Sequence, residues 1–102
     1  MIRVNYLREG DTHKLSVQGH AGWSQHGNDI VCAGVSAISF ALLGYLHNAG
    51  SDIAEAQADS GNLYVECSGD VAGAFDMAVV GYLQIARKYP QCVDVYIAAH
   101  GG

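Results

Sequence analysis

Residues 30–47 read IVCAGVSAISFALLGYLH, and this stretch decides how the chain folds. No charged residue occurs between Ile30 and Leu46, and the run is long enough for about five helical turns. Apolar side chains point in nearly every direction around such a helix. We therefore expect the helix to be buried on more than one side.

Two environments could bury a helix of this kind. One is the core of a protein whose second subunit covers the outer side of the helix, and the other is a membrane. The uncharged run of 17 residues lies at the short end of the spanning range, contains serines and glycines, and has no basic flank. These features favour a core helix in a homodimer, without membrane insertion.

The segments before this helix predict a β-hairpin. Ile2, Val4 and Tyr6 alternate with polar residues, and so do Leu15 and Val17, which is the period of half-buried strands. We therefore expect the first 19 residues to form two paired strands. Residues 19–28 contain three glycines and no apolar period, which predicts a mobile loop.

The segments after the helix repeat the same kind of pattern. Residues 54–58 predict a strand with alanines on its inner face, and residues 63–67 predict its partner. Asp70 can cap a second helix, Pro90 would end it, and residues 93–97 predict a last strand. The order strand, strand, helix, strand, strand, helix, strand predicts an α+β fold: a largely antiparallel sheet of about five strands with two helices packed on one face.

Length and composition predict a single domain over residues 1–102. A chain of 102 residues with 50% hydrophobic residues and 15% charged residues can bury one modest core without a metal or a disulfide. We expect no cofactor.

The charge pattern restricts the partners. The net charge is −5, and seven acidic residues but no Lys or Arg occur between Lys14 and Arg87. A basic stripe that could follow phosphates is therefore absent from the middle of the chain, which argues against direct nucleic-acid binding. An acidic surface favours basic partners instead.

The cysteines predict a reducing compartment. Cys32, Cys67 and Cys92 are odd in number and lack the close pairs of a zinc ribbon, so neither a disulfide framework nor a metal site is expected. Met1 to Tyr6 alternates apolar and polar residues, unlike a signal peptide. We therefore expect a cytoplasmic protein.

Chemistry is best placed at Cys32, near the start of the apolar helix. If Asp29 is the N-cap, Cys32 occupies the third helical position, where unpaired N–H groups and the helix dipole favour the thiolate nucleophile and can stabilise an oxyanion. An ionised Asp29 opposes this effect. His20 and His26 are both candidate bases, and local chemistry does not separate them. The alternative for Cys32 is an inert buried thiol.

The stretch Gly19-His20-Ala21-Gly22, followed by Gly27-Asn28-Asp29-Ile30-Val31-Cys32-Ala33-Gly34-Val35-Ser36, resembles the signature of the ribosomal-processing cysteine protease family, often called Prp. Members of that family are small homodimeric proteases that remove the N-terminal extension of the twenty-seventh large-subunit ribosomal protein. The resemblance is specific over residues 19–36, and elsewhere it is one of length and element order.

The resemblance implies roles for individual residues. The nucleophile of the family falls on Cys32, its general base on His20, its aspartate on Asp29, and its loop on residues 21–28. Gly22 and Trp23 lie in that loop, where Trp23 could close over a bound chain. Ser36 lies one turn beyond Cys32 and either faces the site or bonds back to its own helix.

Three functions remain to be separated. The first is a cytoplasmic cysteine endopeptidase that trims the ribosomal-protein precursor with a Cys-His dyad and so supports ribosome assembly. The second is a non-catalytic assembly module that binds the same basic protein. The third, a thiol redox protein, would need a resolving cysteine close to Cys32, and the sequence has no Cys-x-x-Cys.

Overall fold

In the part of the chain that the structure describes, five strands and two helices follow one another in the order that the sequence predicts. The computed structural model describes residues 1–20, 26–59 and 61–100, and it leaves out the side chains of residues 26–29 and 100. The elements are β1 (Ile2–Glu9), β2 (Thr12–Gln18), α1 (His26–Asn48), β3 (Asp52–Asp59), β4 (Asn62–Ser68), α2 (Ala72–Lys88) and β5 (Val93–His100).

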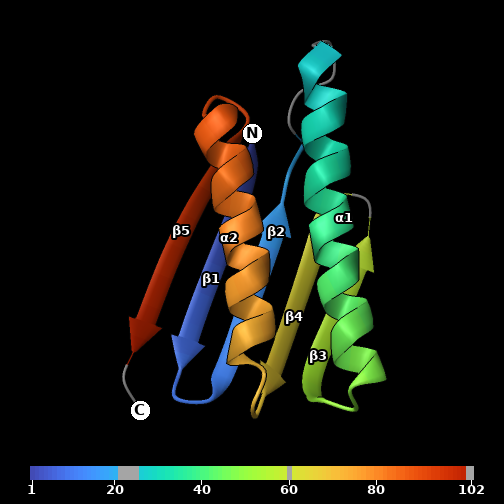
Figure 1. Ribbon diagram of the computed structural model, residues 1–102, viewed down its shortest axis with the longest axis vertical. Helices are drawn as coiled ribbons and strands as arrows, with labels where there is room; N and C mark the ends of the chain where they lie inside the picture. Colours follow the sequence, from blue (N-terminus) through green and yellow to red (C-terminus); the bar gives the residue numbers. More distant parts are fainter. Residues whose placement is uncertain (21–25, 60, 101–102) are drawn as a thin grey trace.

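The strands form one sheet in the order β3-β4-β2-β1-β5. Neighbouring strands are antiparallel except β1 and β5, which run parallel. Both helices cover the same face of this sheet (Figure 1). The predicted α+β architecture is therefore confirmed, and the structure adds the strand order, which local patterns do not encode.

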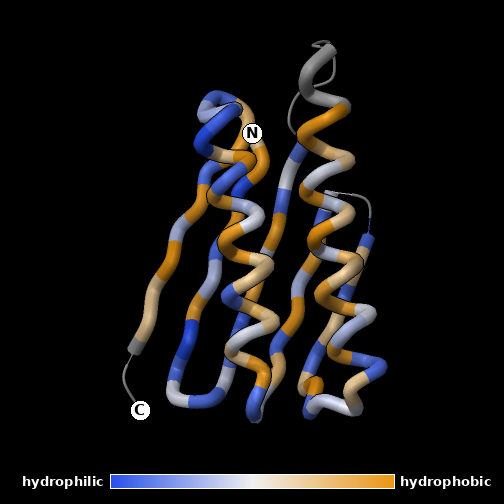
Figure 2. The backbone as a smooth tube through the Cα atoms, viewed as in Figure 1, coloured by the Kyte–Doolittle hydropathy of each residue, from blue (hydrophilic) through white to orange (hydrophobic). Residues whose placement is uncertain are grey.

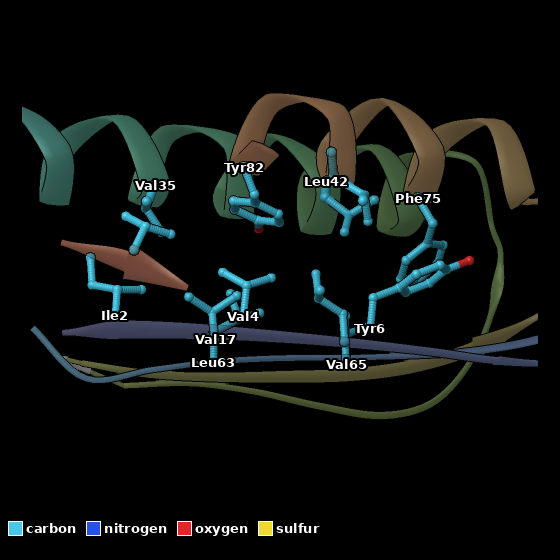
Figure 3. Close-up of a cluster of buried hydrophobic side chains, with 14 of the residues drawn as sticks. Ile2, Val4, Tyr6, Val17, Val35, Leu42, Leu63, Val65, Phe75 and Tyr82 are labelled. Carbon is cyan, nitrogen blue, oxygen red and sulfur yellow. The ribbon is translucent and has the colours of Figure 1, made fainter. Parts of the chain in front are cut away.

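The core lies between the inner face of the sheet and the two helices (Figure 3). The alternation expected from the sequence places every second residue of β1, β2 and β4 in this layer. Each helix adds one buried row, so the core is made by Ile2, Val4, Tyr6, Leu15, Val17, Val31, Val35, Leu42, Leu46, Leu63, Val65, Phe75, Val79 and Tyr82, among others.

Helix α1 is buried on one side and exposed on others. Its inner row contacts the core, whereas Phe40 and Tyr45 are 61% and 56% exposed. Figure 2 shows apolar residues on successive turns of the coloured part of α1, and residues Ile30–Asn48 are long and apolar enough to cross a membrane by length and composition. The same test is passed by core helices, and the inner row of α1 packs against the sheet.

Two predicted helix starts are wrong. Helix α1 begins at His26, four residues before Ile30, so residues 26–28 are not loop. The apolar pattern marks only the part of a helix that packs against other elements, and the first turn carries no such pattern. Helix α2 has Val71, not Asp70, at its N-cap and has no side-chain capping bond. Val71 is buried, so packing rather than a cap fixes this helix start.

A close contact joins the two helices. The Ser39 hydroxyl donates to the Val35 carbonyl at 2.8 Å and shares a second hydrogen bond of 2.7 Å with the Tyr82 hydroxyl. A Cβ at Gly81 would lie 2.8 Å from the Ile38 Cδ1 atom, so only glycine allows this approach without a shift. The position of α1 is therefore fixed from the sheet side and from the α2 side.

A buried aromatic cluster joins β1 and β2 to the start of α2. The rings of His13, Tyr6 and Phe75 contact one another in a triangle, with centroid distances of 5.9 Å between His13 and Tyr6, 4.8 Å between His13 and Phe75, and 5.8 Å between Tyr6 and Phe75. Its Nδ1 shares a hydrogen bond of 2.6 Å with the Tyr6 hydroxyl, and its Nε2 has no partner among the described residues. Burial, assisted by the charge of Arg8, lowers the pKa of His13 below its ordinary value.

This cluster predicts a loss of stability in acid. In the unfolded chain His13 becomes protonated near its ordinary pKa of about 6.5, whereas in the folded chain it stays neutral to a lower pH. Unfolding below about pH 6.5 is therefore accompanied by uptake of a proton. The free energy of unfolding should fall as the pH drops below about 6.5. His13 should contribute up to about 1.4 kcal/mol to this fall for each pH unit.

Urea titrations between pH 7.5 and 5 test this expectation. His13→Phe retains a ring in the cluster and removes the titration, so its stability should depend less steeply on pH. His47→Gln, at the exposed end of α1, is the matched control and should keep the wild-type slope. Equal slopes for the wild-type protein and His13→Phe would contradict the assignment.

Candidate active site

A cleft of about 420 Å³ opens where β2 ends, between the first half of α1 and the turn that joins β3 to β4. Buried apolar residues of the sheet line it, among them Ile2, Val17 and Leu63, together with polar residues such as Asp59 and Asn62. Both candidate catalytic side chains, Cys32 and His20, line this cleft. The fold therefore brings together two residues that are 12 positions apart in the sequence.

His20 is held at the end of β2 by backbone contacts. The Gly19 N–H donates to the Gly61 carbonyl at 2.9 Å, and the Met1 ammonium donates to the His20 carbonyl at 2.6 Å. The imidazole lies over Gly61, where a Cβ would be 2.5 Å from the His20 Nε2 atom. Gly61 therefore leaves the space that this ring occupies.

Cys32 lies on α1 at the border of the core and the cleft. Its side chain is half-buried and packs against the core, while Val31 and Val35 beside it are fully buried. Because α1 begins at His26, Cys32 is the seventh helical residue rather than the third. The predicted contact with unpaired N–H groups is therefore wrong, since these belong to the first turn and the dipole effect fades beyond it.

Cys32 and His20 share the cleft, but no hydrogen bond joins them within the described part of the chain. In free enzymes the catalytic hydrogen bonds are often long and tighten when substrate binds. The lack of this bond in the free protein therefore does not argue against a catalytic pair.

The other predicted site residues have different outcomes. Ser36 is exposed and lines the cleft. The bond back to the helix carbonyl is made by Ser39 instead. Gly22 and Trp23 lie outside the described residues, and so does the side chain of Asp29, whose backbone is in the first turn of α1.

Several residues of the cleft were missed by sequence reasoning. Phe40 and Ser39 come from α1, and Asp59, Gly61 and Asn62 flank the β3–β4 turn. The glycine in the turn was a usable signal for a tight connection, but nothing in the sequence placed that turn next to His20. The contact follows from the β2–β4 pairing, which brings Gln18 opposite Asn62.

The remaining cysteines lie away from the cleft lining. Cys67 is fully buried opposite His13 in the β2–β4 pairing, and burial raises the pKa of its thiol. Cys92 is also buried, before β5. Among the residues that the structure describes, no group of three His, Cys, Asp or Glu side chains could hold a metal ion.

Comparison with known proteins gives consistent results. The family model described as cysteine protease Prp matches residues 1–94. The ribosomal processing cysteine protease Prp of Mycoplasma pneumoniae is 31% identical over 84 residues, which cover 80% of this chain and 84% of that protein. The protein of the same name from Bacillus subtilis is 45% identical over 42 residues, which cover 39% of this chain and 38% of that protein.

The fold matches a solved protease. The ribosomal processing protease Prp of S. aureus, in complex with a substrate peptide, superposes with a TM-score of 0.80 at 20% identity over 95% of this chain and 99% of that one. Its complex with a covalently linked product peptide gives a TM-score of 0.78 at 21% identity and the same coverage.

The family signature over residues 19–36 is thus part of a match that extends over nearly the whole chain, and its histidine and cysteine line one cleft. The chain belongs to the cysteine protease Prp family, and it is accordingly a cysteine protease, a hydrolase.

Proposed function

We propose that this protease removes the N-terminal extension of the twenty-seventh large-subunit ribosomal protein and thereby supports ribosome assembly. Cys32 is the nucleophile and His20 the general base. The observation that carries the proposal is that these two side chains, both in the family signature, line the same cleft. The relatives from M. pneumoniae and B. subtilis bear the name ribosomal processing protease.

The proposed reaction has two stages. His20 accepts the thiol proton while the Cys32 sulfur attacks the carbonyl carbon of the scissile bond, and the tetrahedral intermediate collapses to a thioester as His20 protonates the leaving amine. Water, deprotonated by His20, then attacks the thioester. The acid product leaves and the thiol regains its proton.

The charge and the cysteines fit this role. The net charge of −5 suits a basic substrate such as a ribosomal protein. A free thiol nucleophile stays active in a reducing compartment, so we place the protein in the cytoplasm.

A peptide that spans the junction of the extension tests the assignment. Cys32→Ala should lower its cleavage at least about a thousandfold because the nucleophile is lost. His20→Ala should lower it about a hundredfold or more because proton transfer is lost. His47→Ala removes an exposed histidine at the far end of α1 and should keep full activity, measured by mass spectrometry of the products.

Two results would count against this function. Cleavage that survives Cys32→Ala would exclude the proposed nucleophile. Tight binding of the peptide by the wild-type protein without any turnover would favour the non-catalytic assembly module.

Gly61 provides a second test, of the position of His20. Gly61 has φ = +72°, and a Cβ there would collide with the His20 ring. Gly61→Ala should therefore displace the imidazole and lower kcat about tenfold or more, while KM changes little. Because alanine disfavours the left-handed backbone conformation at this position, the substitution should also lower the free energy of unfolding by about 1 kcal/mol.

Gly50→Ala is the matched control for this variant. Gly50 has φ = +65°, but its Cβ would meet nothing within 4 Å. It should show a similar loss of thermal stability and retain activity. Equal activity losses in both variants would show that backbone strain, not His20 displacement, is responsible.

We further propose that the enzyme is a homodimer whose subunits meet at the helix layer. A second cleft, of about 580 Å³, lies between α1 and α2 and is lined by apolar or small residues, including Ile38, Tyr45 and Met77. Met77 is 76% exposed. Burial of such a surface against its own copy would remove a large apolar area from water.

The dimer is tested by molar mass in solution. Met77→Asp should shift the protein from dimer to monomer because it would bury a charge in an apolar contact. Tyr96→Asp, on β5 and 65% exposed, is the matched control and should remain dimeric. A monomeric wild-type protein would exclude the dimer. If Tyr96→Asp were monomeric while Met77→Asp remained dimeric, the subunit contact would have to be at β5 and not at the helix layer.

A further inference from the structure

The edge of the sheet next to the cleft is an exposed strand. β3 is the last strand on its side and pairs only with β4 among the described strands. In Figure 1 it runs beneath α1 at the border of the sheet. Ala58 and Asp59, at its end, line the cleft that holds Cys32 and His20. The free edge of β3 therefore continues directly into the candidate active site.

The register tells which backbone groups of β3 point to this free edge. Residues 60–61 separate Asp59 from Asn62, and these two flanking residues are partners in the hairpin. In a hairpin with two connecting residues, the flanking pair exchanges both hydrogen bonds and every second pair repeats this pattern. Gln57 therefore bonds to β4, whereas the N–H and C=O groups of Ala56 and Ala58 point outward.

The inner side of this edge has room for a further strand. Ala56 and Ala58 are exposed, although the side chains of their partners Val65 and Leu63 are buried in the core. Phe40 of α1 lines the same cleft as Ala58 and is 61% exposed. A chain laid along β3 would thus have small alanines beside it and an apolar ring of α1 next to its inward side chains.

The charge of the edge selects the kind of chain that can pair there. β3 carries Asp52, Glu55 and Asp59 and no basic residue. Glu55 lies directly opposite Glu66 of β4, whose other cross-strand neighbour is Lys14, and Lys14 also pairs with Glu9 at 3.4 Å, so one cation is shared among three carboxylates. A second copy of β3 would add further negative charge, whereas a basic extended peptide would neutralise it.

We propose that the peptide substrate binds as an additional strand on the free edge of β3, where it accepts a hydrogen bond from the Ala56 N–H and is led into the cleft. This inference rests on the proposed function for the identity of the peptide. When a peptide adds as a strand to an exposed edge, main-chain hydrogen bonds provide the affinity. Every second side chain of the peptide then contacts the protein and provides the selectivity. The mode would hold a cleavage segment extended, as attack by Cys32 requires.

Ala56→Pro tests the inference because it removes one outward N–H. Proline is tolerated in an edge strand where the N–H faces solvent, so the thermal unfolding temperature should fall by only a few degrees. In a Cys32→Ala background the added proline should raise the Kd of the junction peptide about three- to tenfold. Ala56→Ser, which keeps the N–H, is the matched control and should bind like the Cys32→Ala protein.

Backbone methylation of the peptide gives the complementary measurement. Methyl groups on alternate amide nitrogens of the paired segment should weaken binding, and methyl groups on the intervening nitrogens should not, because only every second amide faces β3. Unchanged binding by Ala56→Pro together with no alternation in the methyl series would overturn the inference. Failure of the unmodified peptide to bind the Cys32→Ala protein would also overturn it.

The two proposals fail separately. If the wild-type enzyme cleaves the junction peptide but Ala56→Pro and methylation have no effect, the protease function stands and the added strand does not. If the peptide binds with the alternating pattern but is never cleaved, the added strand stands and the proposed function fails. Alkylation of Cys32 by iodoacetamide should proceed at the same rate in the wild-type protein and in Ala56→Pro, which checks that the site is intact.

Discussion

The packing of α1 against the inner face of the sheet is the contact on which the site depends. Val31 and Val35 lie in the buried row, and Cys32 and Ser36, each one residue later, line the cleft. Because successive residues are about 100° apart around a helix, burial of the first row fixes the direction of the second. Any shift of α1 would therefore move Cys32, the proposed nucleophile, and the bond between Ser39 and Tyr82 holds the same helix from the α2 side.

The other half of the cleft is positioned by strand pairing. His20 follows β2, and Gly61 lies in the turn before β4, 41 positions later in the chain. Since β2 and β4 are neighbours, their ends meet, and the hydrogen bond from the Gly19 N–H to the Gly61 carbonyl closes them. The proposed base, His20, is thus carried by the sheet and the proposed nucleophile, Cys32, by the helix, so the two halves of the candidate site are supported by separate elements.

Local patterns predicted the elements well because each pattern records which side of an element is buried. The alternation in residues 2–6 and 63–67 gave the correct inward faces, and the uncharged run gave α1. The predicted helix starts were wrong: α1 begins at His26, and the N-cap of α2 is Val71. The first turns carry no periodic apolar signal, and α2 has no side-chain capping bond that the sequence could have indicated. In the site, His20 and Cys32 were predicted through the signature, but Gly61 was not, since its role arises from strand order.

The apolar character of α1 on all sides matches the different surroundings that its sides face. One row packs on the sheet, the row with Cys32 and Phe40 faces the cleft, and the row with Ile38 and Tyr45 faces the second cleft beside α2. A helix with only one apolar side would show an amphipathic period, and this one does not because its other apolar residues line the two clefts. The sequence feature that resembles a membrane span is therefore the expected result of placing one helix between a core, the candidate active-site cleft and a proposed subunit contact.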